Sequence, residues 1–461
     1  MTSIGNAIDV HYPWTGEVVG SVPAIEPAEV RAVLDRGAAA PLQLSRHERS
    51  QILFGVADRL ARERAELARE ITLESGLALR DTDHEVGRAI DVFRFAAMEV
   101  LRDDGEAFAL DVSPHGRDRR AHTLRVPARL CAAITPFNHP LNQVAHKVAP
   151  SLAAATPMVL KPSEKTPLAA LRLESIIRDA GAPEHAFQVV CGEPAAIAAE
   201  MLSHDGVEVL SFTGGVAVGR ALAAQLGLRR AALELGGNDP LIVLADADLD
   251  EAAQLAVSGG FSNSGQRCTA VKRILAVDPI ATELVERIVE RTRALRAGDP
   301  LDPTTDVGTV IDEDAAATVV RRVEAAAAAG ATVLHGGERE RALVTPTVLD
   351  YVPRDCELVA EETFGPVAPV IRVRDLDDAI AVANSTPYGL SSAVCTFDWR
   401  AIARCIKELR CGTVNIREVP GYRTELTPFG GIGASGTGVK EGVREAMRLM
   451  TFTKLYTLPW S

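Results

Sequence analysis

The sequence lacks the features of membrane proteins, of secreted proteins and of proteins stabilised by disulfides or a structural metal. No uncharged apolar stretch approaches the roughly 20 residues that cross a bilayer. The first residues, Met1 to Asn6, contain no basic segment followed by an apolar run, so no secretory signal is readable. The 7 cysteines are odd in number and never spaced as Cys-x-x-Cys, which argues against a disulfide framework and a structural zinc site. We therefore expect a cytoplasmic protein with reduced thiols, no metal and no membrane partner.

An excess of basic residues is also absent. The net charge of -13 argues against a nucleic-acid partner, because phosphate backbones are bound by clustered Lys and Arg. A local basic pocket for a small anion stays compatible with this balance. The chain of 461 residues, 47% hydrophobic and 24% charged, has the composition of an ordinary globular protein and is long enough for two or three domains.

Apolar periodicity divides the chain into helical and strand-forming parts. From Pro27 to Arg102, apolar residues recur at intervals of three and four, which predicts a layer of amphipathic helices. Short apolar runs then alternate with helical patterns, as expected for parallel sheets that are covered on both faces. The first series of runs is Leu130 to Ile134, Met158 to Leu160, Phe187 to Val190, Val207 to Ser211, Ala232 to Leu235 and Leu241 to Leu244. The second is Ile274 to Val277, Ala331 to Leu334, Ala368 to Val373, Ser391 to Phe397 and Thr413 to Ile416.

The two series predict an α/β protein with two doubly wound domains, the second of which begins near Gly236. Asp111 to Val126 is polar and rich in Arg and His, which fits a protruding hairpin or a loop. Thr451 to Thr457 alternates apolar and polar residues like an edge strand. Such a strand either pairs with another subunit or docks on its own domain, and the pattern leaves both open.

A cysteine in a glycine-flanked loop, Ser264-Gly265-Gln266-Arg267-Cys268-Thr269, carries the strongest chemical signal. Only a thiolate attacks carbonyl groups, and the neighbouring Arg267 favours that negative charge. Glu234, in Glu234-Leu235-Gly236-Gly237, is a candidate base upstream. Alone, a free cysteine is more often an inert small hydrophobic residue.

Three further motifs end or follow strand runs. Ser211-Phe212-Thr213-Gly214-Gly215 opens a helical stretch whose backbone N–H groups can receive a pyrophosphate. Lys161-Pro162-Ser163-Glu164 offers a carboxylate to ribose hydroxyls and would repel a 2′-phosphate, which favours NAD over NADP. Asn138, between two prolines, can donate to an oxyanion. Gly431 to Gly436 matches G-x-G-x-x-G in letters, but no strand precedes it, so we expect a flexible glycine loop. His139 and His146 have no further ligands at metal-site spacing.

Together these motifs resemble the NAD(P)-dependent aldehyde dehydrogenase superfamily over nearly the whole chain. The matching segments also include Glu361 to Pro366 and Pro428 to Gly431. The resemblance implies that Cys268 is the nucleophile, Glu234 the base, and Asn138 with the Cys268 N–H the oxyanion hole. It implies Glu362 for the nicotinamide ribose and Lys161 with Glu164 for the adenosine ribose. The other cofactor-binding residues it implies are Thr135, Pro136, Phe137, Ser163, Thr213, Gly214, Gly215, Val218, Gly236 and Phe364.

The same resemblance implies the domain plan. Residues 1–110 and 128–235 form a Rossmann-like NAD-binding domain, residues 236–430 a catalytic domain, and residues 111–127 and 447–461 an oligomerisation hairpin and tail of a homodimer or a dimer of dimers. A cysteine thiohemiacetal and then a thioester would form on Cys268, and Glu234, with its pKa raised by burial, would activate the water that releases the acid.

The basic residues Arg88, Arg267, Lys272 and Arg423 point to an anionic aldehyde if they converge on one pocket, because guanidinium groups fork onto phosphoryl or carboxylate oxygens. The segments around Cys268 and Arg423 are most similar to the phosphonoacetaldehyde dehydrogenase branch, which implies Arg88, His139, Arg267, Thr269 and Arg423 around the substrate. Non-phosphorylating glyceraldehyde-3-phosphate dehydrogenases and semialdehyde dehydrogenases are the alternatives. Rivals of other kinds are a CoA-acylating enzyme, which needs no water-activating base, and a non-catalytic structural protein.

Overall fold

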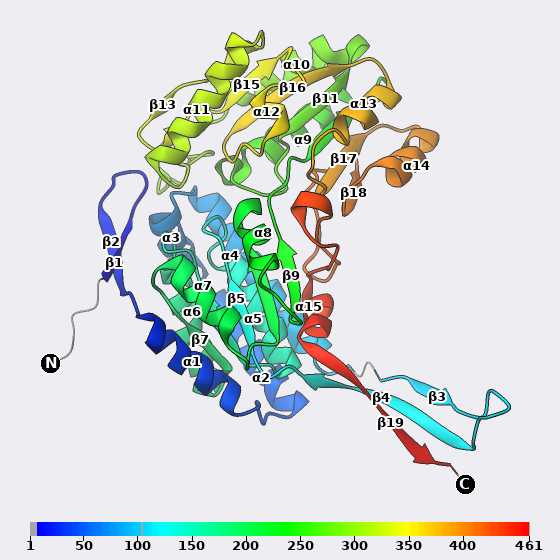
Figure 1. Ribbon diagram of the computed structural model, residues 1–461. Coiled ribbons are helices and arrows are strands. Elements are labelled where there is room, and N and C mark those ends of the chain that lie inside the picture. Colours follow the sequence, from blue (N-terminus) through cyan, green and yellow to red (C-terminus); the bar gives the residue numbers. More distant parts are fainter. Residues whose placement is uncertain (1–6, 103–104, 461) are drawn as a thin grey trace.

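The computed structural model describes residues 7–102 and 105–460 of the chain. Two α/β lobes are stacked on each other, and a narrow three-stranded sheet projects from the lower lobe (Figure 1). The predicted fold, two α/β units and a small β element, is confirmed. Within the described residues, no helix has the length and apolar character to span a bilayer.

The lower lobe is built on a five-stranded parallel sheet in the order β7-β6-β5-β8-β9. The chain starts this sheet at β5, adds two strands on one side and then two on the other. The strand order therefore reverses between β5 and β8, and side chains that follow these two strands face one crevice. The strands are β5 (Cys131–Ile134), β6 (Met158–Lys161), β7 (Phe187–Val189), β8 (Val209–Thr213) and β9 (Arg230–Glu234).

Helices cover both faces of this sheet because its strands are apolar on both sides. One face packs on α2 to α6 and α15, and the other on α1, α7 and α8. The predicted helical layer before residue 102 is confirmed, and its repeating residues, such as Val30 and Leu53, are fully buried. The helices are α1 (Pro27–Ala39), α2 (Arg46–Arg62), α3 (Arg64–Ser75), α4 (Leu79–Glu99), α5 (Asn142–Ala154), α6 (Leu168–Asp179), η1 (Glu184–Ala186), α7 (Pro194–Ser203), α8 (Val216–Ala223) and α15 (Val443–Leu449).

The upper lobe holds a seven-stranded sheet in the order β12-β15-β16-β11-β10-β17-β18. Its strands are parallel except β12 at the edge. The strands are β10 (Pro240–Val243), β11 (Arg273–Val277), β12 (Thr332–His335), β15 (Thr347–Asp350), β16 (Val367–Val373), β17 (Ser391–Cys395) and β18 (Thr413–Ile416).

Two buried clusters, one on each face, join this sheet to its helices. One face packs on α9 and α10, and the other on α11 to α14. These helices are α9 (Leu249–Phe261), α10 (Asp278–Arg293), α11 (Glu313–Ala328), α12 (Glu357–Ala360), α13 (Leu376–Ala383) and α14 (Trp399–Glu408). The 3-10 turn η2 (Ser262–Gly265) follows α9 directly and leads to Cys268.

The projecting sheet contains the predicted C-terminal strand and shows which strand it pairs with. β19 (Thr451–Pro459) pairs along its whole length with β4 (Arg119–Pro127) of the same chain, from Thr451 opposite Pro127 to Pro459 opposite Arg119. Of the two alternatives that the pattern left open, the partner within the same chain is the observed one. β3 (Ala107–Ala109) adds a short strand on the other side of β4, so the sheet begins before the polar segment expected at Asp111.

Some elements were not predicted from the sequence. They are β1 (Ala7–His11), β2 (Val18–Pro23), β13 (Arg339–Glu340), β14 (Leu343–Val344) and β15. The expectation of a flexible glycine loop at Gly431 to Gly436 is wrong. It forms the 3-10 turn η3 (Gly433–Ser435), and the fully buried Ser435 Oγ donates to Gly236 O at 2.7 Å.

Candidate functional site

A cavity of about 170 Å³ lies at the carboxyl ends of β5, β8 and β9 and is closed by loops of the upper lobe. It brings together most of the residues expected at the catalytic centre and nicotinamide site, although they come from five separate parts of the sequence. The cavity is lined by Pro136, Phe137, Asn138, Gln143, Thr213, Gly214, Gly215, Glu234, Leu235, Gly236, Cys268, Glu362 and Phe364. Of these, Gln143 and Leu235 were not predicted.

The loop that presents Cys268 has an unusual backbone. Asn263, Ser264 and Gly265 all have positive φ, at 60°, 54° and 70°. The Asn263 N–H donates to Asp81 on α4 at 2.9 Å, which ties the turn to the lower lobe. Gly265 is required by space as well as by φ, since a Cβ there would lie 2.1 Å from Gly365 O. This turn therefore positions Cys268 in the wall of the first cavity.

Burial controls the thiol of Cys268. The expectation that the adjacent arginine favours the thiolate is wrong in its net effect, because burial raises the pKa of the Cys268 thiol to about 11. Lys272 acts in the opposite direction and lowers it, while Glu362, Asp239 and Glu234 add to the rise. At neutral pH the group is therefore a thiol in the protein without ligands.

Glu234 ends β9 and is 4% exposed. Neither carboxyl oxygen has a hydrogen-bond partner among the described residues. Burial, followed by the charge of Glu441, raises the pKa of Glu234 well above its usual range, in the direction that we expected. Lys147, which bonds Glu441 at 2.9 Å, partly offsets this rise. A carboxyl of this kind is a strong base once deprotonated.

The Asn138 side chain is held rigidly beside the cysteine. Its Nδ2 donates to Gln266 O at 2.8 Å, and its own backbone carbonyl accepts from Asn263 Nδ2 at 3.0 Å. Since an amide carries two N–H groups, one is left for an oxyanion in the cavity. Asn138 is 5% exposed, so such a bond would form in a nearly dry site.

The residues of the crevice fit a dinucleotide. Thr135 directly follows β5, and Thr213 is the last residue of β8. Both hydroxyls are buried and lack a hydrogen-bond partner in the described part of the chain. A Cβ on Gly215, at the start of α8, would meet nothing within 4 Å, so its backbone faces open space. On the far side, Glu362 accepts from the Gly237 N–H at 3.1 Å.

At the other end of the crevice, Lys161 donates to Glu164 at 2.8 Å. Burial works to raise the pKa of Glu164, but its hydrogen bond with Lys161 lowers it, so the carboxylate is charged. Ser163 precedes it and its hydroxyl accepts from the Lys165 N–H. Val218, on α8, is 54% exposed.

A second cavity, of about 480 Å³, adjoins the first across the Arg267–Cys268 peptide, because Arg267 lines one cavity and Cys268 the other. Three of the predicted substrate residues, Arg88, Arg267 and Arg423, lie in its wall. Arg88 is engaged in a two-bond ion pair with Glu425, at 2.6 and 3.2 Å. The other lining residues are His84, Asp91, Phe95, Ser258, Ser262, Glu418, Val419, Gly421, Tyr422, Thr424 and Glu425.

Arg267 and Arg423 form no ion pair with a carboxylate among residues 7–102 and 105–460. Arg423 packs over the Phe429 ring at 4.0 Å, and its Nη1 is buried without a hydrogen-bond partner there. Burial, and then the charge of Arg88, lowers the pKa of both guanidinium groups. Arg423 also lowers the pKa of Arg267, whereas Glu425 and Glu441 raise the pKa of Arg423. Two buried guanidinium groups in one cavity, without a paired carboxylate in the described residues, are suited to binding an anion.

His139 and Thr269 are not among the lining residues described for this cavity. The His139 ring lies 3.6 Å from Glu85 Oε2, and burial lowers its pKa. Thr269 is 7% exposed and packs at Gly421, where an added Cβ would lie 2.4 Å from its hydroxyl. It therefore supports the loop that carries Tyr422 and Arg423.

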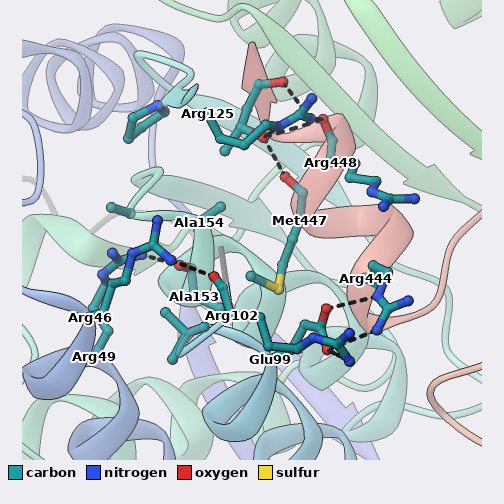
Figure 2. Close-up of a pocket in the computed structure, with 14 residues that line it drawn as sticks. Arg46, Arg49, Glu99, Arg102, Arg125, Ala153, Ala154, Arg444, Met447 and Arg448 are labelled. Atoms are coloured by element: carbon teal, nitrogen blue, oxygen red, sulfur yellow. Dashed lines mark hydrogen bonds and ion pairs between the residues drawn. The ribbon is translucent and has the colours of Figure 1, made fainter. Parts of the chain in front are cut away.

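A third cavity, of about 130 Å³, lies at the foot of the projecting sheet and shares no lining residue with the other two (Figure 2). Its arginines are held by the protein itself. Arg444 bonds Glu99 at 2.8 Å, Arg125 donates to the Arg448 carbonyl at 2.5 Å, and Arg49 donates to the Ala153 carbonyl (Figure 2). We therefore place the chemistry at the two cavities around Cys268.

A two-lobed α/β fold whose crevice, at the reversal of strand order, is lined by a cysteine and a buried carboxyl is typical of nucleotide-dependent oxidoreductases. The chain belongs to the aldehyde dehydrogenase family, whose model matches residues 1–456. It is an oxidoreductase that acts on aldehydes with NAD or NADP as the acceptor.

Two relatives and one solved structure place the chain within the family. The 3-sulfolactaldehyde dehydrogenase of Priestia megaterium is 36% identical, over 90% of this chain and 87% of its own. The lactaldehyde dehydrogenase of Methanocaldococcus jannaschii is 36% identical, over 97% and 96%. The NADP-dependent glyceraldehyde-3-phosphate dehydrogenase of Bacillus halodurans, solved with NADP, matches with a TM-score of 0.97 and 35% identity, over 100% of this chain and 97% of its own.

Several polar residues at the two cavities were not predicted. His84 and Glu425 line the arginine cavity, and Glu425 also bonds His146 at 2.5 Å. Lys147 and Glu441 lie behind Glu234. Lys272 was expected to help grip the substrate anion, but its ammonium is bound to Glu362 instead. Spacing in sequence gives no signal for such pairs, because their partners come from distant segments.

Proposed function

We propose that this protein is an NAD-dependent dehydrogenase that oxidises an anionic aldehyde to the carboxylic acid, and that the aldehyde is a phosphonoaldehyde such as phosphonoacetaldehyde. The observation that carries the proposal is the pair Arg267 and Arg423. These two guanidinium groups share a cavity, lack carboxylate partners in the described chain, and adjoin the Cys268 thiol. Guanidinium groups of this kind are suited to the oxygens of a phosphonate.

Family membership alone does not choose the substrate. By their names, the Priestia relative acts on a sulfonated aldehyde, the Bacillus protein on a phosphorylated one and the Methanocaldococcus relative on uncharged lactaldehyde. The charge in the cavity supports an anionic substrate. A neutral aldehyde would leave Arg423 Nη1 buried without a partner, which costs free energy, whereas an anionic tail satisfies it.

The residues of the first cavity then act in sequence. Once the Cys268 thiol has lost its proton to water in the cavity, its sulfur adds to the aldehyde carbon, and the resulting oxyanion accepts a hydrogen bond from the free N–H of Asn138. The nicotinamide, when bound, supplies the acceptor for the hydride that leaves this carbon. The thioester on Cys268 is attacked by water, whose proton Glu234 takes, and the acid and the free thiol are the products. We propose Thr135, Thr213, Gly214, Gly215 and Glu362 as residues that hold the nucleotide.

A substrate panel tests the proposal. Formation of the reduced nucleotide is measured with phosphonoacetaldehyde, glyceraldehyde 3-phosphate, succinic semialdehyde and uncharged propanal, each with NAD and with NADP. We expect the highest kcat/KM with phosphonoacetaldehyde and NAD. A higher value with glyceraldehyde 3-phosphate or succinic semialdehyde would keep the anion site and change the substrate to one of the alternatives. A higher value with propanal would overturn the anion site.

The variant Arg423→Met tests the anion site itself. Loss of a charge-assisted pair worth roughly 1.5–3 kcal/mol should raise the KM for phosphonoacetaldehyde about 10- to 100-fold, because the tail then lacks its buried partner. The kcat/KM with propanal should stay within about twofold. Arg400→Met, on α14 and away from both cavities, is the matched control and should change neither.

A further inference from the structure

Lys272 lies behind the nucleophile loop and connects it to the opposite wall of the crevice. Its side chain is 3% exposed. The ammonium donates to the carbonyl oxygens of Arg267 at 2.7 Å and Cys268 at 2.6 Å, and it pairs with Glu362 Oε1 at 3.1 Å. These polar partners belong either to the nucleophile loop or to Glu362, which faces Gly236 and Gly237. The ammonium also lies 5.8 Å from the centre of the Phe364 ring.

The carboxylate at Glu362 is held on both sides. One oxygen, Oε1, accepts from the Gly237 N–H at 3.1 Å and pairs with Lys272. The other, Oε2, packs against Gly236, where an added Cβ would lie only 2.1 Å from it. The segment that carries Glu362 is anchored by Arg322 of α11, which donates to the Glu362 carbonyl at 2.5 Å. A group that binds Glu362 from the crevice therefore shares this carboxylate with Lys272, which is paired with one of its two oxygens.

We propose that Lys272 couples the binding of the nucleotide at Glu362 to the reactivity of the Cys268 thiol. It acts as a positioning residue, since its contacts are with the backbone of the nucleophile loop and with Glu362. The inference rests on the proposed role of Glu362 in holding the nicotinamide ribose. Hydroxyl groups that donate to Glu362 would spread its negative charge and leave Lys272 less compensated, which favours the thiolate.

The charges around Cys268 agree in sign with this coupling. Lys272 lowers the pKa of the thiol, and Glu362 raises it. A weaker ion pair between these two residues therefore increases the thiolate fraction at a given pH, and a thiolate is the species that attacks a carbonyl or an alkylating reagent. The charged and titratable groups that act on this thiol are Lys272, Glu362, Asp239, Glu234, Arg267 and Arg423.

The test measures the rate at which iodoacetamide alkylates Cys268 between pH 7 and pH 9, read by mass spectrometry on the peptide that contains it, with and without saturating NAD. Without NAD, Lys272→Met should slow alkylation about tenfold, because a cation next to the thiol is lost. In the wild type NAD should accelerate alkylation several-fold, and in Lys272→Met this acceleration should disappear. Lys272→Arg keeps the charge and should restore most of it. Lys407→Met, on α14, is the control.

Glu362→Gln should change the alkylation rate in the opposite direction to Lys272→Met. It therefore tests the proposal even if Lys272→Met does not fold. Without NAD, its Cys268 should be alkylated several-fold faster than in the wild type, because Lys272 has lost its carboxylate. A rate equal to or below the wild type overturns the proposal, and so does an NAD acceleration in Lys272→Met equal to that of the wild type. These rates need no aldehyde, so turnover in the substrate panel with no such coupling would defeat this inference and leave the proposed function standing.

Discussion

Cys268 and Glu234 line the same cavity, and burial raises the pKa of both. The consequences differ. For the thiol, a higher pKa means that Cys268 is mostly protonated at neutral pH, and the protonated thiol is a poor nucleophile. For the carboxyl, it means a stronger base that is protonated over more of the pH range. The deacylation step, which needs the deprotonated carboxylate, should therefore accelerate as the pH rises toward the raised pKa of Glu234.

Glu234→Gln separates the two half-reactions. Without the base, kcat should fall about 10²- to 10⁴-fold, while one equivalent of reduced nucleotide per site still forms in the first turnover. The thioester should accumulate and appear as an added acyl mass on the peptide with Cys268. Glu290→Gln, an exposed position on α10, serves as the control. Steady turnover at the wild-type rate would rule out Glu234 as the base.

The choice of nucleotide also belongs to single residues. The carboxylate of Glu164 is charged and paired with Lys161. Because it would repel a 2′-phosphate, Glu164→Gln should raise the ratio of kcat/KM for NADP over NAD roughly tenfold, which corresponds to about 1.4 kcal/mol. Glu184→Gln, on η1, should leave the ratio unchanged. An unchanged ratio in Glu164→Gln would place NADP discrimination elsewhere in the crevice.

From the sequence, the candidate residues could be named and the direction of the Glu234 pKa shift predicted, but not the direction of the Cys268 shift. Cys268, Glu234, Asn138 and Glu362 were predicted from motifs, and the structure brings them to one cavity. The predicted direction of the Cys268 pKa shift was wrong. An arginine next to the cysteine in the sequence does not reveal that burial of the thiol outweighs its charge. The ion pair of Lys272 with Glu362 was not predicted, since the two residues are 90 positions apart in the chain.

At the scale of elements, the turn after α9 carries the most constraint. Gly265→Ala would place a Cβ 2.1 Å from Gly365 O on a backbone with φ of 70°, so the turn or the facing loop must move. We expect unfolding to become easier by about 1–3 kcal/mol and kcat to fall at least tenfold. Thermal unfolding and steady-state kinetics measure the two effects.

Gly260, five residues earlier, provides the matched control. It lies within α9, and the nearest atom to an added Cβ is Val271 O at 3.6 Å, an ordinary contact. Gly260→Ala should leave activity unchanged and stabilise the helix by up to about 1 kcal/mol. Equal losses in the two variants would show that the position of Gly265 is not special.

Apolar runs predicted most strands of both sheets, because a strand buried on two faces is continuously apolar. β15 was missed since Thr347 to Asp350 is short and follows a proline, and the β1–β2 hairpin was missed because most of it is exposed. The partner of the last strand was beyond prediction. β19 pairs with β4 across more than 300 positions, and alternation in one strand does not identify the strand beside it.

At the scale of the whole molecule, the projecting sheet is the feature that a lone subunit does not explain. It carries apolar side chains into solvent, and β19 has β4 on one side only. Sheet edges and exposed apolar groups of this kind pair with other chains. The exposed residues are Phe108, Leu124, Phe452, Leu455, Tyr456, Leu458 and Trp460.

We therefore expect the protein to be a homodimer or a dimer of dimers in solution, with this sheet in the contact. Light scattering on the purified chain should give twice or four times the monomer mass. Replacing Leu455 and Leu458, which are 59% and 45% exposed, by Asp should lower that mass, because two charges would be desolvated in the contact. Leu228→Asp, at an exposed site between α8 and β9, should have no effect. A monomeric wild type, or a variant of unchanged mass, would show that the sheet has another role.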